Sequence, residues 1–135
     1  MNERIAHVGI AVKNLENSIA IFSRLFNQPP DHLEEVKDQH VRIAMFRAGE
    51  NSIELLEATT HDSSIATFLE KRGEGVHHVA LVVDNILEEL KRLQQSGFQL
   101  VDETPRLGAD GYLVAFLHPK STNGVLIELS QKIRP

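Results

Sequence analysis

The fold of this chain follows from a stretch near its start, residues 5–15, which reads Ile5-Ala6-His7-Val8-Gly9-Ile10-Ala11-Val12-Lys13-Asn14-Leu15. A second stretch, residues 76–86, repeats its order as Val76-His77-His78-Val79-Ala80-Leu81-Val82-Val83-Asp84-Asn85-Ile86. Each reads as a β-branched strand with a histidine near its start and an asparagine at its end. Asparagine often caps a helix, because its side-chain oxygen accepts hydrogen bonds from the first free amides. The repeat therefore predicts two copies of one strand-and-helix unit.

Helices and hairpins are expected in the same order in both halves. Apolar residues recur close to a 3.6-residue period over Leu15 to Phe26 and over Ile86 to Leu93, which predicts two amphipathic helices. A further short helix, from Ser63 to Arg72, joins the halves and ends at Gly73 and Gly75. The strand patterns predict two hairpins, with strands at residues 41–46 and 52–56 and at residues 112–117 and 125–129.

We expect a single domain. The chain has 135 residues, 41% of them hydrophobic, and no linker rich in proline, glycine or serine separates its halves. Within domain 1–135, module one is placed at about residues 1–60, the connecting helix at about 61–74 and module two at about 75–135.

Composition excludes several classes of function. A net charge of -5, with 14 lysines and arginines that form no run, argues against nucleic acid as a partner. No apolar stretch approaches the roughly 20 residues that span a bilayer, and no signal-peptide core follows Met1, so we expect a cytoplasmic protein. The absence of cysteine excludes disulfides and thiolate zinc sites, so a metal would have to bind histidine and carboxylate.

Four such side chains occupy equivalent places in the two halves: His7, Glu54, His78 and Glu128. The histidines lie 71 positions apart and the glutamates 74, so one repeat nearly superposes both pairs. Strand alternation sends each pair to one face. A glutamate between apolar neighbours, taken alone, is more simply explained by a solvent-facing position. The coincidence of four favours a divalent cation, and two imidazoles with two carboxylates suit Co, Ni, Mn, Zn or Fe.

The other histidines receive different interpretations. His77 should face away from the site, where it would have a structural role or would contact one of the ligand side chains from outside the site. Three lie in polar segments and are expected to be exposed: His32, His40 and His61. His118 begins a loop through Gly124 that contains Lys120 and Ser121, and this loop either grips an acidic ligand or only turns the chain.

The chain resembles the vicinal oxygen chelate (glyoxalase I/dioxygenase) superfamily and, within it, the methylmalonyl-CoA epimerases. The similarity runs from His7 to Glu128 over nearly the whole chain. Its most specific stretches are SIATFLEKRGEGVHH at residues 64–78, PRLGA at residues 105–109 and FLHPKSTNGVLIE at residues 116–128.

The resemblance implies an α+β fold of two paired βαβββ modules forming a curved, partly open eight-stranded sheet around a metal site. It implies ligands at His7, His78 and Glu128, with Glu54 at a fourth position that is commonly glutamine or glutamate. It also implies a divalent metal, most often cobalt, an acyl-CoA substrate, a homodimer and a place in propionate metabolism. The implied reaction interconverts R- and S-methylmalonyl-CoA by proton transfer at C2 through a metal-stabilised enolate.

Inversion at carbon most simply needs two acid/base groups, one for each face. We assign one role to Glu128 and the second to Glu54 or to a water molecule on the metal. Some relatives carry a glutamate at the place of Ile43, and an isoleucine cannot transfer a proton. Lys120 and Ser121 are the candidates for substrate binding.

Three rival functions share the fold. A glyoxalase I, or lactoylglutathione lyase, has a matching ligand set, although residues 73–78 and 118–124 favour the epimerase. A dioxygenase normally uses two histidines and one glutamate with iron and is usually longer. A metal-free ligand-binding module would retain its affinity after exhaustive chelation.

Overall fold

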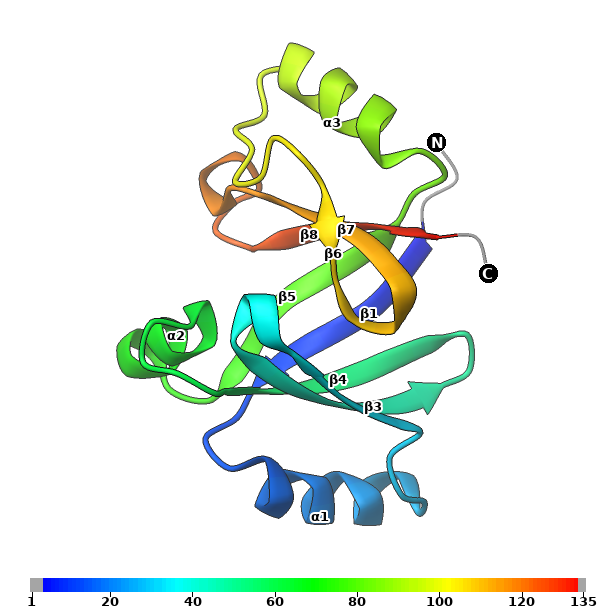
Figure 1. The fold of residues 1–135 in the computed structure, drawn as a ribbon, viewed down its shortest axis with the longest axis vertical. Coiled ribbons are helices and arrows are strands. Elements are labelled where there is room, and N and C mark those ends of the chain that lie inside the picture. Colours follow the sequence, from blue (N-terminus) through cyan, green and yellow to red (C-terminus); the bar gives the residue numbers. More distant parts are fainter. Residues whose placement is uncertain (1–3, 134–135) are drawn as a thin grey trace. The chain divides into compact units, whose positions relative to one another are not determined.

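The computed structural model describes residues 4–133, in two compact units. One unit comprises residues 7–77, called here the N-terminal unit; the C-terminal unit comprises residues 78–135 together with residues 1–6. The ends of the predicted domain, residues 1–3 and 134–135, lie outside the described residues. Figure 1 shows the elements in order: β1 (Arg4–Ala11), α1 (Leu15–Phe26), β2 (His32–Val36), β3 (Val41–Ala48), β4 (Asn51–Ala58), α2 (Ser64–Arg72), β5 (Gly75–Val82), α3 (Ile86–Gln95), β6 (Arg106–Leu107), β7 (Tyr112–Leu117) and β8 (Ile127–Lys132).

In the N-terminal unit the strand order is β2-β3-β4-β1, with β1 parallel to β4 and the other pairs antiparallel. Helix α1 packs along β3 and β4 (Figure 1). The core on this face includes Leu15, Leu55 and Phe46, and the ring of Phe26 stacks on Phe46 with centroids 5.5 Å apart. Because α1 covers one face of the sheet, the opposite face remains for other side chains.

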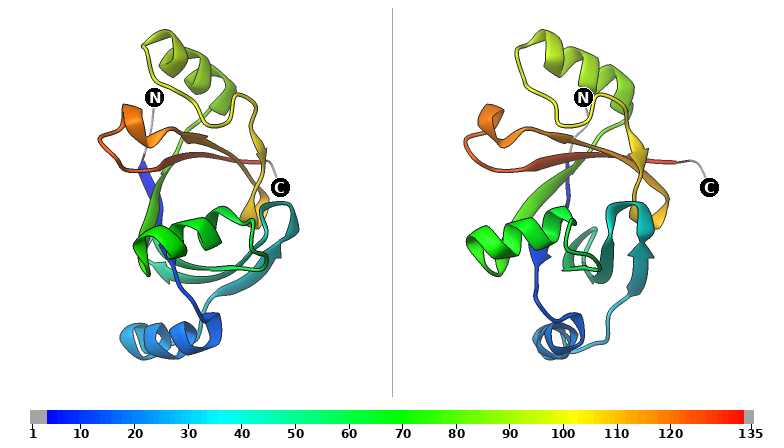
Figure 2. Two further views of the ribbon diagram at one scale, coloured as in Figure 1. Left: turned by 90° about the vertical axis from the view of Figure 1, so that its left-hand side faces the viewer. Right: turned by 60° about the vertical axis from the view of Figure 1, so that its left-hand side comes forward.

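The C-terminal unit repeats this plan with the strand order β5-β8-β7-β6, in which β5 and β8 are parallel. Helix α3 lies against β7 and β8 in both views of Figure 2 and contributes Ile86, Leu90 and Leu93 to the core. The predicted α+β class with two βαβββ modules is confirmed. Of the described helices, none has the length and apolar character to cross a membrane.

The two long helices begin in the same way. The side-chain oxygen of Asn14 accepts a hydrogen bond from the Asn17 amide at 2.9 Å, and that of Asn85 from the Glu88 amide at 3.1 Å. A second acceptor reaches the first helical amide from the last strand of each unit. Two contacts are made: Leu15 N–H to Glu57 Oε2 at 2.9 Å, and Ile86 N–H to Gln131 Oε1 at 2.8 Å. Both asparagine caps predicted from the repeat are thus confirmed.

The residue patterns do not locate two short strands of the expected eight, β2 and β6, which lie at the outer ends of the two strand orders. Their sequences are mostly polar, His-Leu-Glu-Glu-Val and Arg-Leu, and show no clear alternation of apolar residues. Strand β8 begins at Ile127 rather than at Val125, because the Val125 carbonyl accepts the Thr122 hydroxyl and keeps that residue in the turn. Backbone pairing with a neighbouring strand therefore defines elements that propensity alone leaves open.

Candidate metal centre

In the N-terminal unit His7 and Glu54 form a pair. His7 lies on β1 and Glu54 on β4, where the parallel register places Glu54 beside Gly9. The Nδ1 atom of His7 lies 3.2 Å from Oε2 of Glu54, and Glu54 is only 5% exposed. Because glycine has no side chain, no side chain projects from Gly9 beside the carboxylate.

In the C-terminal unit His78 and Glu128 form the equivalent pair, with His78 Nε2 at 3.0 Å from Glu128 Oε1. Both side chains are buried, at 5% and 6% exposure. The Ser130 hydroxyl donates to Oε2 of Glu128 at 2.8 Å, and the edge of the Phe116 ring meets the His78 ring with centroids 5.6 Å apart. These contacts fix the orientation of both potential ligands.

The alternative that Glu54 and Glu128 simply face solvent is wrong, because both are buried. A buried carboxylate is costly unless a cation or hydrogen-bond donors compensate its charge. In an octahedral site with bonds of about 2.1 Å, neighbouring ligand atoms lie about 3.0 Å apart. The separations of 3.2 and 3.0 Å within the pairs match this spacing, so each pair fits two ligands on one divalent ion.

The face of the N-terminal sheet that carries Glu54 holds a second pair that sequence reasoning missed. His32 Nε2 lies 2.8 Å from Glu34 Oε1 on β2. His32, expected from the sequence to be exposed, keeps 39% of its side chain exposed while it makes this contact. His40 is also half-buried, whereas His61 is exposed as expected. The missed signal was His-x-Glu, a spacing that puts both side chains on one face of a strand.

The predicted substrate loop is held in place by its own polar groups. The Ser121 hydroxyl accepts a hydrogen bond from the Gln99 amide at 2.8 Å, and His118 Nδ1 accepts one from the Lys120 amide at 3.1 Å. The Lys120 side chain is exposed. His77 packs edge-on against Phe68 of α2, with centroids 5.0 Å apart, which fits a structural role.

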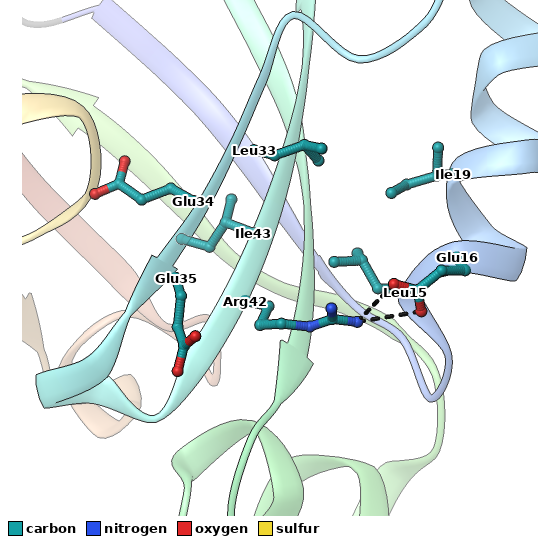
Figure 3. A pocket seen from close by; sticks show the side chains of 8 residues that line it. All are labelled: Leu15, Glu16, Ile19, Leu33, Glu34, Glu35, Arg42 and Ile43. Carbon is teal, nitrogen blue, oxygen red and sulfur yellow. Dashed lines mark hydrogen bonds and ion pairs between the residues drawn. The ribbon is translucent and has the colours of Figure 1, made fainter.

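A hollow of about 260 Å³ lies elsewhere in the N-terminal unit, between α1 and the strands β2 and β3 (Figure 3). Arg42 forms ion pairs with Glu16 and Glu57 there. Its hydrogen bond to Glu57, and to a smaller extent the one to Glu16, raise the pKa of Arg42 above its usual value. His7 and Glu54 are not among its lining residues. The hollow therefore does not contain the proposed metal ligands, although Glu34 and Ile43 are among its lining residues.

Comparisons with known proteins place the chain in a family. Residues 6–116 match the Glyoxalase/Bleomycin resistance protein/Dioxygenase superfamily. The mitochondrial methylmalonyl-CoA epimerase of Dictyostelium discoideum is 40% identical over 132 residues, which cover 96% of this chain and 78% of that protein. The ethylmalonyl-CoA/methylmalonyl-CoA epimerase of Cereibacter sphaeroides is 36% identical over 130 residues, 95% of this chain and 97% of that protein.

A solved structure gives the same result in three dimensions. It is a serine-to-threonine variant of the Streptomyces coelicolor methylmalonyl-CoA epimerase in complex with 2-nitronate-propionyl-CoA. Its TM-score is 0.91 at 33% identity, covering 96% of this chain and 94% of that one. The family expected from the sequence is thereby confirmed. The chain belongs to the Glyoxalase/Bleomycin resistance protein/Dioxygenase superfamily, in the part of it that includes the methylmalonyl-CoA epimerases.

Proposed function

We propose that this protein is a metal-dependent epimerase that interconverts R- and S-methylmalonyl-CoA by proton transfer at C2. The observation that carries the proposal is the presence, at the same place in each unit, of a His–Glu pair whose carboxylate is buried. Similarity to epimerases over nearly the whole chain supplies the substrate class, an acyl-CoA thioester with an acidic C2 proton.

The proposed ligands are His7, Glu54, His78 and Glu128, acting together on one divalent cation. Two carboxylates would neutralise its charge, and a mixed nitrogen and oxygen set suits cobalt, the metal expected from the family, as well as Ni, Mn, Zn or Fe. When bound, such an ion would act as a Lewis acid toward the acyl oxygen and lower the cost of enolate formation by several kcal/mol.

Proton transfer is assigned to the protein. Glu128 is the first acid/base group, because the Ser130 hydroxyl holds one of its oxygens and leaves the other directed at His78. For the second face of the carbon the sequence offers Glu54 or a water molecule. Lys120 and Ser121 are proposed to contact the substrate, whose negative charges suit a basic and hydroxyl-bearing loop.

The wider setting is also proposed. The reaction would serve propionate metabolism in the cytoplasm, and the protein would act as a homodimer. A glyoxalase I-type lactoylglutathione lyase remains the alternative enzyme, because it shares the ligand types and enolate chemistry. A metal-free ligand-binding module of the same fold is the alternative outside catalysis.

The test begins with elemental analysis of the purified protein, followed by incubation with methylmalonyl-CoA in deuterium oxide. We expect about one divalent ion per chain and deuterium at C2 of both epimers. His7→Ala should lower metal content and deuterium incorporation together, because it removes a ligand. Turnover of the glutathione hemithioacetal without exchange at C2 would favour the lyase, and ligand affinity that survives exhaustive chelation would favour the metal-free module.

A further inference from the structure

Glu34 shares a sheet face with the proposed metal ligands of the N-terminal unit. Two rows cross the sheet in register: His32 beside Met45 beside Glu54, and Glu34 beside Ile43 beside Leu56. Residues directly opposite each other in such pairs project from the same face. Among the register-paired residues of β1 to β4, Glu34 and Glu54 are the carboxylates on this face.

The neighbours of Glu34 on β2 point the other way. Figure 3 shows Leu33 and Arg42 directed toward α1, whereas Glu34 and Ile43 are directed away from it. Glu35 pairs in register with Arg42 and therefore belongs to the α1 face. The direction of Glu34 thus follows from strand alternation and is not an accident of one side-chain conformation.

Glu34 is also equipped to exchange protons. His32 holds its carboxylate at 2.8 Å, and the two side chains are 39% and 30% exposed, so protons can pass from the pair to water. Strands lie about 4.8 Å apart, so β2 is about 10 Å from β4.

Glu54 and Glu128 are buried to nearly the same degree and each lies against a histidine, so burial does not distinguish them as acid/base groups. Glu34 differs from both in its exposure, which lets it exchange protons with water directly. Ile43, which lies between Glu34 and Leu56 in register, has no group that transfers protons.

We infer that Glu34 is the second acid/base group of the epimerisation, an inference that rests on the proposed function. In one direction the Glu34 carboxylate takes the C2 proton, the electron pair of the broken C–H bond enters the enolate, and Glu128 delivers a proton to the opposite face. In the other direction the two residues exchange roles. Each turnover removes one proton and adds one, and His32 positions Glu34 while the pair re-equilibrates with water.

The experiment follows inversion and C2 exchange separately, in deuterium oxide, starting from each pure epimer. Glu34→Gln should lower inversion by at least about 100-fold, the usual contribution of one acid/base group. Exchange without inversion should persist for the epimer whose C2 proton faces Glu128. Metal content and melting temperature should be unchanged, because Glu34 is half-exposed and is not a proposed ligand.

Two variants complete the design. Glu35→Gln changes the next residue on the opposite face and should retain wild-type inversion, while Glu34→Asp should retain measurable inversion. Wild-type inversion in Glu34→Gln would overturn the inference, as would equal loss of exchange for both epimers together with loss of metal. Wild-type protein that shows neither exchange nor inversion would instead overturn the proposed function.

Discussion

The two units hold the same His–Glu pair in different surroundings. Glu128 lies opposite Phe116 and accepts the Ser130 hydroxyl, whereas Glu54 lies opposite Met45 and has Leu56 at the position of Ser130. One carboxylate therefore has a hydroxyl donor built into its own strand. The two pairs therefore share their residue types but differ in the side chains that contact the carboxylate.

The edge strands differ in charge at the equivalent register position. Glu34 lies opposite Ile43 in the N-terminal unit, and Arg106 lies opposite Val114 in the C-terminal unit. Arg106 is close to Asp102, at 3.9 Å between Nη1 and Oδ1. The two units therefore carry opposite charges at one equivalent position of the repeat.

The largest expected effect comes from replacing Glu128 or Glu54 with glutamine. Glu128→Gln should lower the epimerisation rate by about 10³-fold, because it removes a proton-transfer group as well as a charged ligand. Glu54→Gln should cost about 10-fold to 100-fold, since an amide oxygen still binds a cation. The rates of both variants, measured at saturating metal, give the comparison.

Equal losses in these two variants would show that the pairs are functionally equivalent, and the assignment of Glu128 as an acid/base group would then be wrong. Metal content provides the control, because each amide should leave the ion bound at high metal concentration. The melting temperatures should stay close to that of the wild type, since each amide replaces its glutamate at almost unchanged volume.

A smaller effect is expected from Ser130→Ala, which removes the donor from Glu128 Oε2 without touching a proposed ligand. Partners behind a ligand usually contribute about 10-fold to 100-fold in metal affinity or activity. We therefore expect Ser130→Ala to lose activity or metal affinity in that range. The measurements are the epimerisation rate and the chelator concentration at which that rate falls by half. Leu56→Ala is not an equivalent control, because it opens a cavity, so Leu56→Met serves instead.

Much of the fold could be predicted from short-range patterns. Helix α1 spans Leu15 to Phe26 and β7 spans Tyr112 to Leu117, as expected from the apolar periods and turn residues. The repeat also identified both His–Glu pairs, because one offset links the histidines and nearly the same offset links the glutamates. Local rules suffice where each element is specified by its own residues.

Other features depend on contacts between distant segments, which the sequence does not state. Strand β2 owes its pairing to β3, and the His32–Glu34 pair becomes visible only once that register is known. The acceptors at the helix starts, Glu57 and Gln131, lie 42 and 45 positions from the amides that they bind. Such contacts need the folded chain, and the sequence offers only the spacing that permits them.

The smallest expected effects concern those helix starts, where stability is measured in place of activity. Gln131→Ala removes one acceptor from the Ile86 amide and should cost about 1 kcal/mol. Glu57→Ala removes both the acceptor of the Leu15 amide and the ion-pair partner of Arg42. It should lower the free energy of unfolding by about 2 kcal/mol, because each contact contributes about 1 kcal/mol when Arg42 is partly exposed. In thermal unfolding, the Tm of Glu57→Ala should be roughly 3–5 °C below that of Gln131→Ala.

Glu57→Gln makes the N-terminal unit resemble the C-terminal one, and it separates the two contributions. The amide oxygen still accepts the Leu15 N–H, so only the charge interaction with Arg42 weakens, and a loss below about 1 kcal/mol is expected. If Glu57→Gln were as destabilising as Glu57→Ala, the ion pair with Arg42 rather than the helix amide would dominate. The two units would then secure their helices by different physical means, despite the identical geometry of the amide contact.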